Sequence, residues 1–272
     1  MTWIDIGCNL GHESFAGDFE TVIERALEHG IDMMIVTGAS IAGSERALEL
    51  ARQRPDCLRA TAGVHPHLAA EVDTDAIARL RELQTEDPVV ACGECGLDYF
   101  RDLSPRPVQL KAFERQLELA VDAGKPLFLH QRDAHDDFHS LLRQFRDRLG
   151  SVVVHCFTDT RRAMYDYLDL DCHIGITGWI CDERRGRELK EIVIDIPDDR
   201  LMLETDAPYL KPRNLRPKVR SHRNEPCWLP WIGGTVAALR GVSPQVLARQ
   251  TSANARAFFS LPEVTEQAGS TA

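Results

Sequence analysis

Short apolar segments alternate with longer helical segments along almost the whole chain of 272 residues. Eight segments have the length of a strand and are rich in apolar and β-branched residues, at 3–8, 32–37, 58–64, 88–93, 126–130, 151–155, 172–177 and 200–205. Segments with helical periodicity follow them at about 19–30, 41–54, 74–86, 107–124, 135–149, 161–170, 184–194 and 226–240. This alternation is typical of a parallel β-sheet whose strands are connected by helices.

The number of repeating units predicts the class of fold. Eight strand–helix units without a long linker favour an α/β fold with a single (β/α)8 TIM-type barrel as one domain over residues 1–260. A doubly wound open sheet is the alternative, because sequence patterns count strands only to within about one or two. A further helix is expected at 244–259, and residues 261–272 are expected to form a short flexible tail.

The charge balance restricts the classes of partner. The chain carries 42 acidic and 32 basic residues, which gives a formal net charge of −10. A protein of this charge should not attract nucleic acid or an anionic membrane over a broad surface, so a polyanion must bind at a local basic patch. No apolar run approaches the roughly 20 residues that cross a bilayer, so membrane insertion is not expected.

Eight cysteines are spread over the chain, and the first ten residues, MTWIDIGCNL, lack the features of a secretory signal. In a chain without a secretory signal, cysteines are usually reduced thiols rather than disulfides. We therefore expect a cytoplasmic protein. No protein partner can be inferred from the sequence.

Four polar residues follow apolar strand segments directly: Glu94, His130, His155 and Asp206. In a barrel, the carboxyl ends of the strands meet at one mouth, where the active sites of this fold lie. Two imidazoles and two carboxylates at that mouth predict a site for a divalent metal. Taken singly, each histidine could be a hydrogen-bonded structural residue, and each acid could cap a helix.

Three more residues lie beside these candidates without a unique interpretation. His65 follows the third strand and is predicted to contact the substrate, although it could also reach the metal. His67 fits a site role and a plain loop equally well. Asp98 could support a metal ligand or cap the next turn.

A basic segment follows Asp206. Residues 211–223 contain six lysines and arginines and no acidic residue. Beside a metal, such a loop suits an anionic substrate, most simply a phosphodiester, and the predicted substrate contacts are Arg213, Arg216, Arg220, Arg223 and Asn224. A solvated surface loop is the alternative interpretation.

Several motifs together resemble the TatD-type metal-dependent deoxyribonucleases. They are DIGCNL (5–10), GVHPH (63–67), GECGLDY (93–99), HQRDAH (130–135), HCFTDT (155–160), GITGWICDERRG (175–186), ETDAPYL (204–210) and RNEP (223–226). The resemblance implies an amidohydrolase-like barrel in which Glu94, His130 and His155 hold a divalent cation and Asp206 is the remaining carboxylate. It also implies magnesium- or manganese-supported hydrolysis of DNA, as a 3′–5′ exonuclease on single strands and also on RNA.

Two positions depart from the wider family pattern. Gly7 and Asn9 stand where many members have two metal-binding histidines, which predicts one tightly held cation. Asp159 stands where a glycine is usual.

The predicted mechanism is metal-assisted hydrolysis. Asp206 is the expected catalytic base, or else helps to bind a second, weaker cation. The carboxylates favour magnesium or manganese, and the imidazoles would also accept zinc. Two alternatives remain: an amidohydrolase or ester hydrolase for a small anionic substrate, and a binding protein with a degraded metal site.

Overall fold

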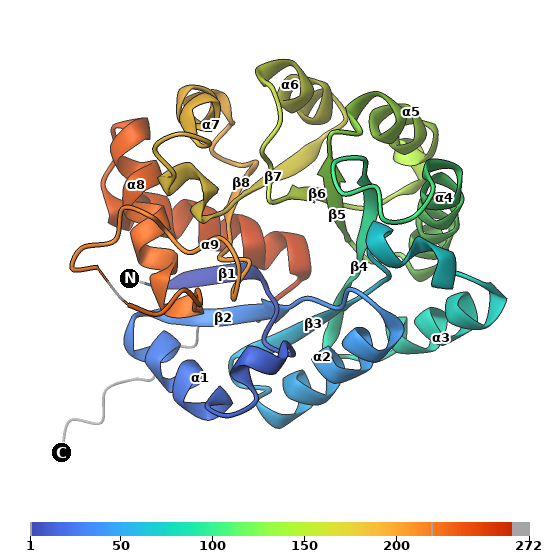
Figure 1. The fold of residues 1–272 in the computed structure, drawn as a ribbon, viewed down its shortest axis with the longest axis horizontal. Helices are drawn as coiled ribbons and strands as arrows, with labels where there is room; N and C mark the ends of the chain where they lie inside the picture. The colour runs from blue at the N-terminus through green and yellow to red at the C-terminus, as the bar shows by residue number, and fades with distance from the viewer. Residues whose placement is uncertain (1, 219, 263–272) are drawn as a thin grey trace.

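Eight parallel strands form one sheet in the order in which they occur along the chain (Figure 1). A computed structural model describes residues 2–218 and 220–262. The strands are β1 (Trp3–Cys8), β2 (Ile31–Val36), β3 (Leu58–Ala62), β4 (Val89–Asp98), β5 (Leu127–Arg132), β6 (Val152–His155), β7 (Cys172–Ile176) and β8 (Leu201–Leu203). This sequential order confirms the predicted (β/α)8 barrel, because a doubly wound sheet changes direction between its two halves.

Helices surround the sheet and connect its strands (Figure 1). They are α1 (Phe19–Glu28), α2 (Ile41–Gln53), α3 (Thr74–Gln84), α4 (Arg106–Ala123), α5 (His135–Phe145), α6 (Arg161–Asp169), α7 (Arg187–Ile192), α8 (Leu229–Arg240) and α9 (Pro244–Phe259). The predicted helix 184–194 is shorter than expected, because the Asp182 carboxylate accepts the backbone N–H groups of Arg184 and Arg185 in a turn. Among the helices of the described residues, none is both long and apolar enough to cross a membrane.

The barrel closes between β1 and the segment that follows β8. The backbone N–H of Asp206 donates to Gly7 O at 2.9 Å, and that of Asn9 donates to Ala207 O at 2.6 Å. The buried carboxylate of Asp5 joins the same two segments, since it accepts Thr205 N at 2.9 Å and Thr205 Oγ1 at 2.5 Å. Side-chain hydrogen bonds thus supplement the backbone bonds along this seam.

The apolar core has two parts. One fills the barrel and is closed by α9, with Ile4, Ile6, Met33, Ile35, Ala91, Phe128, Val153, Met202, Ala255, Phe258, Phe259 and Leu261. The other lies between the sheet and the surrounding helices. Leu261, the first residue of the expected tail, is buried in the first part. Residues 263–272, the rest of that tail after Pro262, lie outside the described residues.

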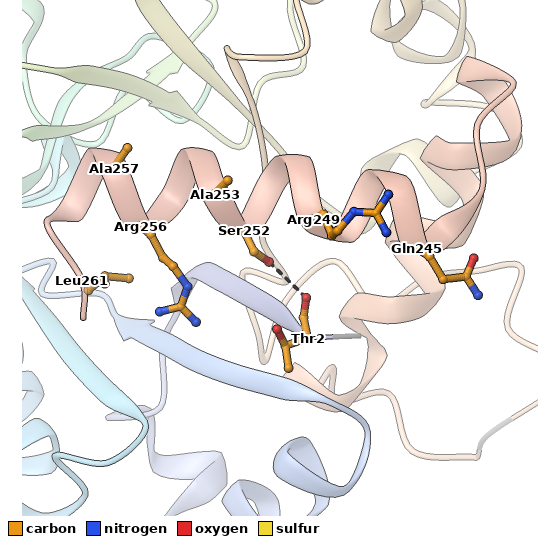
Figure 2. Close-up of a pocket in the computed structure, with 8 residues that line it drawn as sticks. All are labelled: Thr2, Gln245, Arg249, Ser252, Ala253, Arg256, Ala257 and Leu261. Carbon is orange, nitrogen blue, oxygen red and sulfur yellow. Dashed lines mark hydrogen bonds between the residues drawn. The ribbon is translucent and has the colours of Figure 1, made fainter. Parts of the chain in front are cut away.

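A surface pocket lies along α9 beside the start of β1 (Figure 2). Figure 2 shows Arg249, Ser252 and Arg256 projecting from the helix beside Thr2, and Ser252 Oγ donates to Thr2 O at 3.1 Å. Thr2 precedes β1, so this pocket lies at the amino ends of the strands. It is therefore at the opposite end of the barrel from the predicted site.

Candidate metal centre

Polar side chains lie directly above the apolar filling of the barrel. Side chains on one face of a strand recur at every second residue. The inward positions that follow the core residues Phe128, Val153 and Met202 are therefore His130, His155 and Glu204. All three lie toward the carboxyl ends of the strands, so they gather at the mouth of the barrel.

Glu94 is at the centre of this group. We expected it and His130 to follow their strands, but β4 continues to Asp98 and β5 to Arg132. One extra residue bulges between Cys92 and Cys95, which face Leu127 and Leu129 of β5. The bulge changes the side-chain alternation, which explains how Glu94 joins the inward group two strands from His155.

Three imidazoles surround one oxygen of Glu94. His155 Nε2 lies 2.7 Å, His130 Nδ1 3.2 Å and His65 Nε2 3.4 Å from Glu94 Oε1. Burial lowers the pKa of His65 to about 3, so this ring is neutral and can offer a lone pair to a metal. The histidine that we predicted to contact substrate is therefore part of the central cluster.

The donor set fits a divalent cation. Ligand atoms of His65, Glu94 and His130 lie within 4.8 Å of one another. In addition, His130 Nε2 is buried and, apart from Asp98 Oδ2 at 3.4 Å, has no partner among residues 2–218 and 220–262. Imidazole nitrogens beside a carboxylate are ligands for manganese, zinc and related metals, so these residues support binding of a divalent metal.

Asp98 supports the cluster from the outer side. Its Oδ2 lies 2.8 Å from His67 Nε2 and 3.4 Å from His130 Nε2. Burial alone would raise the pKa of Asp98, but His130 and His67 outweigh it and hold this pKa well below its usual value. Both residues that the sequence left open, His67 and Asp98, thus lie beside a candidate ligand.

Glu204 lies behind His155 and was not predicted as a site residue. It is fully buried, its Oε2 lies 3.4 Å from His155 Nδ1, and its Oε1 accepts Cys156 N at 2.5 Å. A carboxylate at this place fixes the orientation of a ligating histidine. The signal in the sequence was its position directly after β8, two residues beyond the inward-facing Met202.

Asp206 is partly exposed at the mouth, three residues beyond the end of β8. Asn9 Nδ2 donates to its Oδ1 at 2.9 Å. Burial, together with the charges of Glu94 and Glu204, raises the pKa of Asp206 to about 7, although His155 acts in the opposite direction. This carboxyl is thus poised to exchange a proton near neutral pH.

Gly7 is closely surrounded. A Cβ atom at this position would lie 2.5 Å from Glu204 Oε2 and 2.8 Å from Phe128 Cζ. Those two side chains therefore occupy the space that a larger residue at position 7 would need.

Asp159, the second position that departs from the family pattern, uses its carboxylate for hydrogen bonds. It accepts Gln131 Nε2 at 3.0 Å and Thr160 N at 2.7 Å.

The basic segment divides into exposed and engaged side chains. Arg216, Lys218 and Arg220 are exposed. Arg213 is also exposed, with its Nη1 3.3 Å from Asp182 Oδ2. These four residues leave a positive surface on the loop that follows Asp206.

Arg223 and Asn224 are engaged within the protein. Arg223 donates to both carboxylate oxygens of Asp18, at 2.8 and 2.6 Å, and to Glu225 at 2.8 Å. Asn224 is fully buried, and its Nδ2 donates to Thr205 O at 2.9 Å. These contacts hold the loop against the barrel, and the contact of both residues with substrate stays a prediction.

Comparisons with known proteins identify the family of this chain. The family described as TatD related DNase matches residues 4–260. A protein of Erwinia billingiae named 3′-5′ ssDNA/RNA exonuclease TatD is 50% identical over 258 residues, which cover 95% of this chain and 99% of that protein. The protein of the same name from Erwinia tasmaniensis is 51% identical over 257 residues, covering 94% and 99%.

A solved structure gives the same result for the fold. The crystal structure of YJJV, a TatD homologue from Escherichia coli, superimposes with a TM-score of 0.86 at 28% sequence identity, over 96% of this chain and 98% of that one. The chain therefore belongs to the TatD family of metal-dependent deoxyribonucleases.

Proposed function

We propose that this protein is a 3′–5′ exonuclease that hydrolyses single-stranded DNA and RNA with the help of a divalent metal. The observation that carries the proposal is the cluster of three imidazoles around Glu94 at the mouth of a TatD-family barrel. The names of the two Erwinia relatives support the direction of cleavage and the kind of substrate. Because the mouth also carries an exposed basic loop, an anionic polymer suits it better than a neutral substrate.

We assign the metal to Glu94 and His130, with His155 and His65 as the imidazoles that complete its coordination. Magnesium or manganese suits the carboxylates, and zinc would be accepted by the imidazoles. When bound, such an ion polarises a phosphoryl oxygen and makes a nearby water easier to deprotonate. Asp98 and Glu204 hold His130 and His155 in orientation, through contacts of 3.4 Å each.

Asp206 is assigned as the general base. Asn9 occupies Oδ1 of this carboxylate, so we assign the proton of the attacking water to Oδ2. This oxygen can accept a proton from water and release it to solvent in each cycle. The exposed Arg213, Arg216 and Arg220 are assigned to the phosphates of the substrate, where they offset its charge.

The test is hydrolysis of end-labelled oligonucleotides by the purified protein. Single-stranded DNA with a 5′ label should give a ladder that shortens stepwise from the 3′ end with Mg²⁺ or Mn²⁺ present, and no products with EDTA. Duplex DNA should be degraded more slowly. Internal cuts without a ladder would contradict the assignment as an exonuclease.

The same assay separates the two alternatives. Hydrolysis of small carboxylic esters or amides, with intact oligonucleotides, would indicate an amidohydrolase. Binding of DNA without hydrolysis under any divalent metal would indicate a binding protein. For the location in the cell, the eight free cysteines of the structure support our proposal of the cytoplasm.

A further inference from the structure

Two aromatic rings and two guanidinium groups alternate in a chain of contacts. Arg132 Cζ lies 3.9 Å from the centre of the Phe100 ring and 5.6 Å from that of Trp179. Arg185 Cζ lies 4.5 Å from the Trp179 ring. We name Phe100, Arg132, Trp179 and Arg185 the aromatic–arginine chain. It joins the last residue of β5 to the segments that follow β4 and β7, all at the mouth.

The chain begins beside the candidate metal centre. Arg132 is two residues after His130 on β5, a separation of roughly 7 Å along a strand, and it has the same side-chain orientation. Phe100 is two residues after Asp98, which contacts His130. A ligand bound at the metal centre could therefore extend onto these side chains without leaving the mouth.

Trp179 and Arg185, the members far from the metal centre, are held by hydrogen bonds within the protein. Phe100 and Arg132, the members near it, can contact a ligand. Trp179 Nε1 donates to Arg185 O at 3.1 Å, and Arg185 Nε donates to Asp182 at 3.0 Å. In contrast, 54% of Phe100 is exposed. Among the described residues, the Arg132 side chain has neither a carboxylate within ion-pair distance nor a hydrogen-bond acceptor, so its N–H groups are free for a ligand.

Phe100 and Arg132 are both incompletely used by the fold: the ring is half exposed, and the guanidinium has no acidic partner among the described residues. A large apolar ring gains stability when it is buried, and Phe100 forgoes most of that gain. An arginine with no acidic partner at a mouth that already contains Glu94, Asp98, Glu204 and Asp206 is suited to an anion that arrives from outside.

From this arrangement we propose that the aromatic–arginine chain is the docking platform for the single-stranded substrate. The base of one nucleotide near the scissile bond stacks on the exposed face of Phe100. Arg132 holds that ring by its own stacking contact and donates N–H groups to the adjacent phosphate. This inference rests on the proposed nuclease function and identifies where the polynucleotide binds.

The platform also accounts for a preference for single strands. A base inside a duplex is stacked on both faces by its neighbours, so it cannot stack on a protein ring without being unpaired first. A base in a single strand is free to do so, and every base has a face that stacks, so the contact tolerates any sequence. Phe100 thus gives selectivity for strandedness rather than for sequence.

The first experiment compares steady-state kinetics of the metal-loaded wild type with Phe100→Ala and Phe100→Tyr. Loss of the ring should raise KM for a single-stranded oligonucleotide by roughly 5- to 150-fold, the equivalent of about 1–3 kcal/mol of stacking. Tyrosine should restore the wild-type KM. The metal content of both variants should equal that of the wild type, because Phe100 does not belong to the residues assigned to the metal.

Tyr165→Ala is the matched control. Tyr165 is a ring of similar exposure, 45%, but it lies on α6 outside the mouth. Its loss should leave KM unaltered. Equal increases in KM for Tyr165→Ala and Phe100→Ala would overturn the proposal, as would an unchanged KM for Phe100→Ala.

A second experiment locates the stacked base by its removal from the substrate. Oligonucleotides with a single abasic site at each of the last four 3′ positions should show one position at which wild-type KM rises. Phe100→Ala should lose the sensitivity to that position, because ring and base contribute only together. If wild type and variant respond alike at every position, Phe100 does not stack a base.

Arg132 is tested by Arg132→Lys, which keeps the charge but removes the planar group. We expect a higher KM for single strands with unchanged metal content; loss of metal would instead mean that Arg132 only maintains β5 and His130.

Failure of the proposed function and failure of this inference give different results. If wild type hydrolyses bis(4-nitrophenyl) phosphate but no polynucleotide, the proposed function falls and this inference with it. If the wild type is an active exonuclease but Phe100→Ala and Arg132→Lys have the wild-type KM for single strands, only the inference is overturned.

Discussion

At the scale of single residues, the site divides into groups that can hold a metal and a group that can move a proton. Glu94 contacts three imidazoles at 2.7 to 3.4 Å, whereas Asp206 contacts Asn9 and has a pKa raised to about 7. A ligand carboxylate must stay ionised, and a base must be able to take up a proton. The two carboxylates therefore suit different tasks, although they lie at the same mouth.

The variant Asp206→Asn tests this division. It keeps the size of the side chain and a partner for Asn9, but it removes the proton acceptor. We expect single-turnover hydrolysis of single-stranded DNA to slow by roughly 10²- to 10⁴-fold, the usual effect of losing a general base. Metal content, measured by elemental analysis after gel filtration, should stay at the wild-type level. Glu94→Gln is the comparison, and equal loss of metal in both variants would make Asp206 a primary ligand.

Sequence reasoning identified most of these residues for a physical reason. Polar side chains such as His130 and His155 are conspicuous because they follow apolar strands, and that position alone places them at the mouth. Glu204 was missed because it lies inside the predicted strand 200–205, so that Asp206 was taken as the polar residue of this strand end. The contacts that engage Arg223 and Asn224 could not be foreseen either, because Asp18 and Thr205 are distant along the chain.

At the scale of structural elements, each strand and helix was predictable but their irregularities were not. The bulge in β4 depends on how that strand pairs with β5, and no local pattern in Cys92–Cys95 announces it. The same holds for the seam between β1 and β8, where the buried Asp5 carboxylate bonds to Thr205. A charged residue within an apolar strand was the only sign of this contact.

The seam yields a prediction about stability. Asp5→Ala leaves Thr205 N–H and its hydroxyl without their buried acceptor, and each unsatisfied group costs about 1–3 kcal/mol. We expect the free energy of unfolding, measured by urea titration, to fall by roughly 2–5 kcal/mol. Thr205→Val serves as the second variant of a double-mutant cycle. Strictly additive effects of the two changes would show that the contact contributes nothing to closure.

His173 at the start of β7 gives a prediction about pH. Burial beside Phe258 of α9, with the nearby charge of Arg200, lowers its pKa below the ordinary value of 6.5. Protonation therefore favours the unfolded chain. The contribution of His173 to stability is complete above about pH 6.5 and declines as the pH falls below that value.

The measurement compares urea unfolding of wild type and His173→Gln at pH 7.5 and pH 5.5. Wild type should lose more stability between these two values than the variant, because glutamine does not titrate. The other histidines contribute equally to both proteins and cancel in the comparison. An identical loss in wild type and variant would show that His173 does not titrate differently in the folded and unfolded states.

At the scale of the whole molecule, the barrel separates stability from chemistry. Its amino end is closed by α9 and apolar residues, whereas its carboxyl end carries the candidate metal centre, the basic loop and the aromatic–arginine chain. This separation is general for barrels, in which loops at the carboxyl end vary without disturbing the core. Changes at the mouth should therefore alter metal and substrate binding with little effect on folding.

Metal stoichiometry follows from the packing around Gly7. Glu204 and Phe128 fill the space in which a larger side chain at that position would lie, so no ligand can be supplied there. We expect one tightly bound cation per chain after dialysis, and any second cation only at high metal concentration or with substrate. Elemental analysis of dialysed protein checks this. Two equivalents of metal per chain that survive dialysis would contradict it. His130→Ala should lower the metal content below one equivalent per chain.

The last prediction concerns the charge of the molecule. A protein with a net charge of −10 can bind a polyanion only through local positive groups, and the exposed part of the loop after Asp206 provides Arg213, Arg216, Lys218 and Arg220. Contacts with two to four phosphates should give a slope of log K against log [salt] of roughly −1.5 to −3, at about −0.7 per contact on single strands. Replacing Arg216 and Arg220 together by glutamine should weaken binding and flatten this slope.

Arg148→Gln combined with Arg162→Gln provides the control, because both residues lie on the outer wall of the barrel, after α5 and on α6. This control changes the net charge by the same amount, so it should leave the slope unaltered if the contacts are local. Bis(4-nitrophenyl) phosphate should be hydrolysed equally by all three proteins, since it cannot reach along the loop. Should both double variants flatten the slope to the same extent, the field of the whole molecule governs binding, and the loop has no special role. If only the loop variant does so, the positive segment brings the polynucleotide to an otherwise acidic protein.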